Sequence, residues 1–111
     1  MMQLNLKQIS KIDTKIQIDN NKFIVQIDVS KDKGKGWTLD EICFNIYCID
    51  KQYNIIWQVK EIKTKPPFEG RDPFYYLGKN DKGEITADRS SGFEYKIDPE
   101  TGEAVQIGFH K

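Results

Sequence analysis

The sequence predicts an all-β fold, an antiparallel β-sandwich or small barrel of about eight short strands with room for one short helix. Two observations lead to this prediction. Apolar and polar residues alternate over most of the 111 residues, which is the period of half-buried strands. Glycine- and proline-containing turns interrupt the alternation at short intervals. No internal repeat or low-complexity linker divides the chain, so we expect one globular β domain over residues 1–111.

The N-terminal third predicts strands before a charged turn at residues 31–36. Alternation begins at Ile16 and Ile18 and is clearest at positions 23, 25, 27 and 29, where apolar side chains share one face of a strand. Glycines and lysines then alternate in the turn, as in a surface hairpin loop. The first twelve residues are compatible with an edge strand and with a short helix, and the pattern leaves both open.

Residues 38–49 carry two competing signals. Thr38 and Glu41 have the spacing of a helix capping box, and Leu39, Ile42, Ile46 and Ile49 have helical spacing. Against a helix, residues 41–50 are rich in Ile, Phe, Tyr and Cys, and even positions 42 to 48 form a continuous apolar face. We therefore predict a strand, and its apolar character on both faces indicates a central one.

The two cysteines, Cys43 and Cys48, are predicted to be buried and reduced. In a strand their Cα atoms would lie roughly 16 Å apart with side chains on opposite faces, so they cannot form a disulfide with each other. A catalytic Cys–His pair is disfavoured because the one histidine, His110, lies beside the C-terminus. The nitrogen and sulfur ligands of a zinc site cannot be assembled either.

The C-terminal half predicts strands joined by tight turns. The firmest turn is residues 98–102, Asp-Pro-Glu-Thr-Gly, which supplies proline for the first turn position and glycine for the left-handed bulge position of a hairpin. A proline-containing loop at residues 66–73 interrupts the sheet. The other predicted elements are turns at residues 50–54 and 80–83 and strands at residues 55–62, with Trp57 in the core, and at residues 75–77, 84–87, 93–97 and 105–109.

Composition and motifs argue against several classes of function. Seventeen Lys and Arg balance seventeen Asp and Glu, so the chain lacks the broad basic field of a non-specific nucleic-acid binder. We find no phosphate-binding glycine loop, no calcium-binding loop and no pair of acids singled out for catalysis. We therefore expect no catalytic residues, no cofactor and no metal. Without an apolar stretch long enough for a secretion signal or membrane span, we expect a cytoplasmic protein that binds no membrane.

Aromatic residues in or beside loops are the candidate partner-binding site. These residues do not follow the alternation that marks core positions. Acidic and basic residues lie between them, as in protein interfaces. The alternative is that the loop folds back and packs them over the end of the sandwich. The candidate residues are Trp37, Phe68, Glu69, Arg71, Asp72, Phe74, Tyr75 and Tyr76.

Composition and one C-terminal stretch carry a resemblance to a known family. It is short and rich in Ile, Lys and Asn, with charged hairpins, and residues 92–102 read Gly-Phe-Glu-Tyr-Lys-Ile-Asp-Pro-Glu-Thr-Gly. In this style it resembles the immunity proteins of bacterial polymorphic and contact-dependent toxins. The resemblance implies a cytoplasmic antidote that binds one cognate toxin, often a nuclease, by masking its active site or a neighbouring surface. The competing hypothesis is a ligand- or carbohydrate-binding β-sandwich that uses Trp37, Tyr75 and Tyr76 as a stacking platform.

Overall fold

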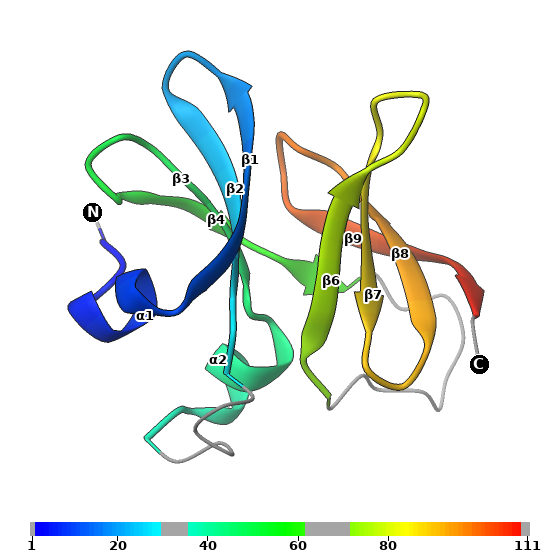
Figure 1. Ribbon diagram of the computed structural model, residues 1–111, viewed down its shortest axis with the longest axis horizontal. Helices are drawn as coiled ribbons and strands as arrows, with labels where there is room; N and C mark the ends of the chain where they lie inside the picture. The colour runs from blue at the N-terminus through cyan, green and yellow to red at the C-terminus, as the bar shows by residue number, and fades with distance from the viewer. Residues whose placement is uncertain (1, 30–35, 62–71, 110–111) are drawn as a thin grey trace.

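The structure is a computed structural model that describes residues 2–29, 36–61 and 72–109. Within these residues the chain forms nine strands in two sheets and two short helices, and neither sheet closes into a barrel. Figure 1 shows the N-terminal sheet and the C-terminal sheet side by side, with the chain passing from one to the other after β4. The predicted mainly-β fold is therefore confirmed. Neither helix in the described ranges is long and apolar enough to cross a membrane.

The N-terminal sheet is antiparallel, and α1 precedes it. The strands run in the order β1-β2-β3-β4, with the bounds β1 Ile12–Asp19, β2 Lys22–Ile27, β3 Ile46–Ile49 and β4 Ile55–Gln58. Helix α1 (Leu6–Ser10) settles the open question at the N-terminus in favour of a short helix followed by a strand. It begins at Asn5, whose side chain accepts from the backbone of Gln8 while the Gln8 side chain accepts from the backbone of Asn5.

The C-terminal sheet has the order β5-β9-β8-β7-β6. Its strands are β5 Lys60–Glu61, β6 Phe74–Lys79, β7 Ile85–Arg89, β8 Phe93–Ile97 and β9 Glu103–Phe109. All pairs are antiparallel except β5 with β9, which is parallel. The prediction of one antiparallel strand at residues 55–62 is therefore wrong in part. The backbone of Val59 donates to Ile46 in the first sheet, and Lys60 donates to Gly102 beside the second, so the chain changes sheet there.

The segment predicted as a strand from residue 41 begins instead as a helix. Helix α2 (Leu39–Cys43) starts at Thr38, whose hydroxyl accepts from the backbone of Glu41 at 3.1 Å while a Glu41 carboxylate oxygen accepts from the backbone of Thr38 at 2.8 Å. This capping box outweighed the β-favouring composition because it satisfies backbone groups locally. Only the second half forms the strand β3, and every residue of β3 is buried.

Three predicted turns are confirmed, at residues 50–54, 80–83 and 98–102. In the last, Gly102 has a φ of +80°. Its N–H donates to the carbonyl of Asp98, and the Asp98 N–H donates to the carbonyl of Glu103. A Cβ at Gly102 would lie 2.5 Å from the Trp57 ring, so glycine is required for packing as well as for conformation. The predicted loops at residues 31–36 and 66–73 lie largely outside the described residues.

Apolar side chains form two clusters that share the first sheet. One lies between the sheets and includes Ile46, Cys48 and Trp57 from the first and Leu77 and Ile97 from the second. The other covers the opposite face of the first sheet. The predicted burial of β3 on both faces, of Trp57, and of two free cysteines is therefore confirmed. In β9 the alternation marks the strand correctly, but the apolar side chains at positions 105, 107 and 109 are exposed.

Candidate protein-binding surface

The first residue of β6 is held by side chains that come from the other sheet. Asn45, between α2 and β3, accepts from the Phe74 backbone N–H at 2.8 Å through Oδ1 and donates to the Phe74 carbonyl at 2.8 Å through Nδ2. Gln26 of β2 donates to the same carbonyl at 2.9 Å, and Asn45 Nδ2 also donates to the carbonyl of Ile27 at 2.7 Å. We call these three residues, Gln26, Asn45 and Phe74, the sheet joint. It fixes where β6 begins relative to the first sheet.

Behind the sheet joint lies a fully buried arginine, Arg89. Its Nη1 donates to the carbonyl of Cys43 at 2.8 Å and to the carbonyl of Asp72, and its Nε lies 3.4 Å from a carboxylate oxygen of Glu61. The guanidinium also lies 4.2 Å from the centre of the Phe74 ring. A buried charge is tolerated only with such partners, so Arg89 connects the end of α2, the approach to β6 and β5.

The environment of Arg89 also affects its neighbour Tyr95. Burial, followed by the interaction with Glu61, raises the pKa of the Tyr95 phenol to about 12, although Arg89 acts in the opposite direction. The phenol therefore stays protonated at physiological pH.

Asp72, just before β6, is held by the β7–β8 turn. Its carboxylate accepts from the Ser90 hydroxyl at 2.9 Å and from the backbone of Ser91 in the β7–β8 turn. Its carbonyl accepts from Arg89, and Pro73 accepts from the backbone of Ser90 at 3.1 Å. Asp72 and Pro73 are thus held through the Asp72 side chain and through the backbone of both residues, which restricts the conformational freedom of the chain before β6.

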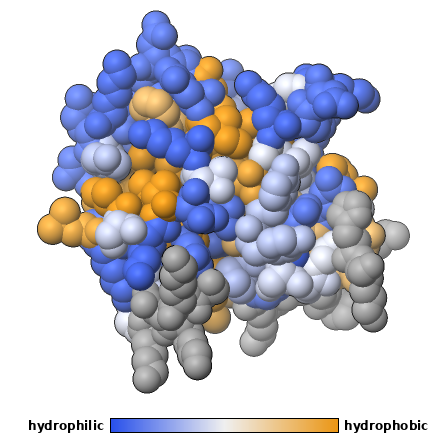
Figure 2. All heavy atoms as spheres, in the orientation of Figure 1, coloured by the Kyte–Doolittle hydropathy of each residue, from blue (hydrophilic) through white to orange (hydrophobic). Residues whose placement is uncertain are grey.

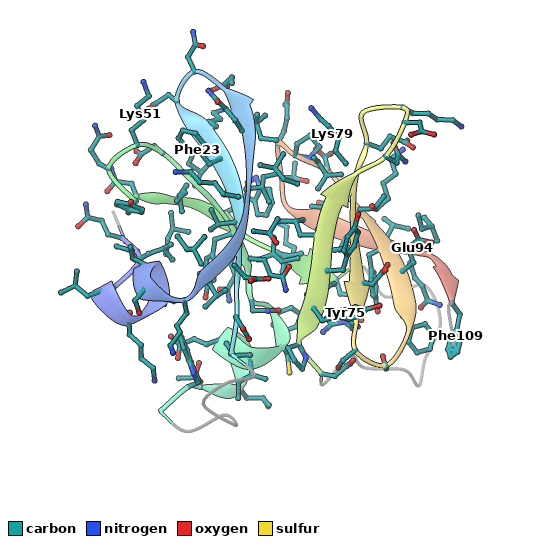
Figure 3. All side chains as sticks on the ribbon, in the orientation of Figure 1. Phe23, Lys51, Tyr75, Lys79, Glu94 and Phe109 are labelled. Atoms are coloured by element: carbon teal, nitrogen blue, oxygen red, sulfur yellow. The ribbon has the colours of Figure 1, made fainter. Side chains whose placement is uncertain are left out.

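Two aromatic side chains project from this fixed strand into solvent. Tyr75 is 58% exposed and Tyr76, the next residue in the chain, is 48% exposed. We call these two residues the tyrosine surface. Figure 3 shows Tyr75 at the start of β6, with Lys79 at the far end of the strand. The Tyr76 ring lies over Gly78, where an added Cβ would be 2.2 Å from the Tyr76 hydroxyl. In Figure 2 the surface over β6 is pale, the colour of side chains of intermediate hydropathy.

The candidate residues named from sequence divide into three groups. Tyr75 and Tyr76 lie in the first half of β6 and are exposed, and Asp72 precedes the strand. Trp37 and Phe74 are corrections, because both are buried. Trp37 packs in the cluster on the far face of the first sheet, under the Lys7 ammonium group at 4.2 Å, and Phe74 lies between the sheets. The remaining candidates, Phe68, Glu69 and Arg71, lie outside the described residues.

Sequence reasoning missed the polar residues that hold the site. Gln26 occupies the polar face of a half-buried pattern, Asn45 follows a short helix, and Arg89 ends a short strand. Gln26 and Asn45 are 2% and 1% exposed and Arg89 is fully buried, yet polar residues at such positions are ordinarily solvated. No local pattern distinguishes them, because their partners lie 17 to 48 residues away.

The candidate surface consists of exposed tyrosines on a strand whose first residue is hydrogen-bonded to the other sheet. No group of three or more His, Cys, Asp or Glu side chains suited to a metal ion occurs in the described parts of the chain. Residues 5–109 match the family model described as Domain of unknown function (DUF7957), and the chain belongs to that family. Comparison with curated proteins gives no match, and comparison with solved structures gives none.

Proposed function

We propose that the protein works by binding another protein through the tyrosine surface, and that the partner is a cognate toxin which it neutralises in the cytoplasm. The observation that carries the proposal is the exposure of Tyr75 and Tyr76 on a strand whose start is fixed by the sheet joint. Tyrosine supplies large contact area with few rotatable bonds, and such rings are enriched in protein interfaces. A preorganised strand also loses less conformational entropy on binding.

The choice of a toxin as partner rests on the resemblance to immunity proteins. An antidote of this kind acts by occupying a surface and needs no chemistry of its own, which agrees with the support role of the buried Arg89 cluster. The carbohydrate-binding hypothesis required Trp37, Tyr75 and Tyr76 to share one platform. Trp37 belongs to the cluster on the far face of the first sheet, so these three rings do not form that platform.

The test is neutralisation of a toxin-like protein encoded directly upstream of this gene. Co-expression should restore growth of cells that produce the toxin, and the two purified proteins should form a complex. The Tyr75→Ala variant should weaken that complex by about 2 kcal/mol, roughly thirtyfold in Kd, while its melting temperature stays that of the wild type.

A control variant removes another exposed side chain, far from the tyrosine surface in the sequence. Leu6 in α1 is 85% exposed, so Leu6→Ala should change neither the affinity nor the melting temperature. An unchanged affinity in folded Tyr75→Ala would place the interface elsewhere. Continued growth arrest despite a formed complex would contradict the antidote function itself.

A further inference from the structure

A small crevice lies beside the tyrosine surface, where the two sheets meet at the start of β6. It has a volume of about 140 Å³, and its walls include Asp13 of β1, Asp28 just after β2, Pro73 and Tyr75. Pockets for cofactors and drug-sized ligands have volumes of about 300 to 1,000 Å³. This crevice is therefore of a size to take one side chain and not a whole small molecule.

The polar residues that line the crevice include several hydrogen-bond acceptors. Asp13 and Asp28 contribute carboxylates, and Gln26, which is 2% exposed, forms part of the wall. The Gln26 amide has a defined orientation, because Nε2 must face the Phe74 carbonyl to which it donates at 2.9 Å. Its Oε1 is consequently a buried oxygen with no hydrogen-bond partner among the described residues. Buried acceptors in native proteins are almost always paired, so this oxygen requires a donor, which is either a water molecule or a group that enters the crevice.

We propose that this crevice binds an arginine side chain of the partner protein. The guanidinium would lie against the Tyr75 ring, place its positive charge between the carboxylates of Asp13 and Asp28, and donate an N–H to Gln26 Oε1. Arginine matches the site because its planar group carries several donors in a fixed fork and stacks on aromatic faces. The inference rests on the proposed function for the identity of the binder as a protein, but the chemistry of the crevice does not depend on that partner being a toxin.

Other cationic ligands fit the crevice less well. A lysine ammonium is a compact charge without a planar face, so it would use the Tyr75 ring less effectively. Calcium takes six to eight oxygen ligands, whereas the crevice offers two carboxylates and one amide oxygen from side chains. Arginine alone uses the ring, the charge and the buried acceptor together.

The test uses the full chain and a short probe, the blocked peptide acetyl-Gly-Arg-Gly-amide, followed by two-dimensional NMR. At millimolar concentrations the peptide should produce saturable shifts in the Gln26 side-chain amide signal and in the backbone signals of Asp13 and Tyr75. The same peptide with citrulline, which keeps the shape and loses the charge, should bind about tenfold more weakly. Saturation at the crevice together with discrimination against citrulline would support the proposal.

Variants at exposed positions test the individual contacts. Asp13→Asn and Tyr75→Leu should each weaken binding of the arginine peptide by about fivefold, whereas Tyr75→Phe, which keeps the ring, should bind like the wild type. Asp19→Asn, at the exposed far end of the same strand as Asp13, is the control and should have no effect.

Three results would overturn the inference. They are shifts that do not saturate, equal binding of the corresponding lysine peptide, and displacement of the arginine peptide by low concentrations of Ca²⁺. The outcome is separable from that of the proposed function. A domain that binds the arginine peptide yet neutralises no toxin would support the arginine site and contradict the antidote function. Neutralisation that is insensitive to Asp13→Asn, with no peptide binding, would support the antidote function and contradict the arginine site.

Discussion

The sheet joint predicts a large loss of stability on replacing one residue, Asn45. In Asn45→Ala, the Phe74 N–H and the Ile27 carbonyl each lose the Asn45 side chain as partner, while the Phe74 carbonyl keeps the bond from Gln26. Each buried group left without a partner costs about 1 to 3 kcal/mol, so we expect a loss of about 2 to 6 kcal/mol. The free energy of unfolding of a whole domain is typically about 5 to 15 kcal/mol, so this loss would be a large fraction of it.

Urea unfolding followed by tryptophan fluorescence measures this loss. The midpoint should fall while the slope of free energy against urea stays constant, because the surface exposed on unfolding is nearly the same. Asn20→Ala, at an exposed turn position, is the control and should change stability by less than about 0.5 kcal/mol. A loss below about 1 kcal/mol in Asn45→Ala would refute the reasoning that these bonds hold β6 to the first sheet.

A double variant tests whether Asn45 and Gln26 act together. Gln26→Ala alone leaves the Phe74 carbonyl bonded to Asn45, and Asn45→Ala alone leaves it bonded to Gln26. Only the double variant removes both donors, so its loss should exceed the sum of the single losses. Strict additivity would show that the two side chains stabilise the joint independently.

The remaining predictions concern the core and the fold. Phe74→Ala should lower stability by about 3 to 5 kcal/mol, measured by urea unfolding, because the ring is buried between the sheets. Gly102→Ala should lower the melting temperature, since the new methyl group would meet the Trp57 ring in a backbone conformation unsuited to alanine. Cys43 and Cys48 should react slowly with a thiol reagent until the protein is unfolded, because both are buried and burial raises the pKa of the Cys48 thiol from 9.0 to about 11. The neutral thiol stabilises the fold fully below pH 9, and this contribution should disappear as the pH rises through about 11. The far-UV circular dichroism spectrum should be dominated by strand, and a helical spectrum would contradict the fold.

The sequence alone determined the features that depend on neighbouring residues. The turn at residues 98–102 was predictable because Pro99 and Gly102 impose backbone angles that few other sequences adopt. Alternation located most strands for a similar reason, since successive side chains of a strand face opposite sides whatever the strand pairs with. The lapse of that alternation marked Tyr75 and Tyr76 as candidates for exposure, but it left a packed position open for both.

Tertiary structure decided the features that depend on distant partners. Whether residues 60–61 continued β4 or joined β9 was settled by hydrogen bonds to the 98–102 turn, some forty residues away. Gln26 and Asn45 became interior residues because the second sheet covers them and Phe74 pairs with their amides. Arg89, in the second sheet, became interior because Cys43 and Glu61 supply partners for its guanidinium. Trp37 and Phe74 are buried, and not exposed at a binding surface, for the same reason. An aromatic ring beside a loop is buried or exposed according to what packs over it. Local pattern fixes the direction of a side chain, and only the assembled sheets fix whether solvent or protein lies there.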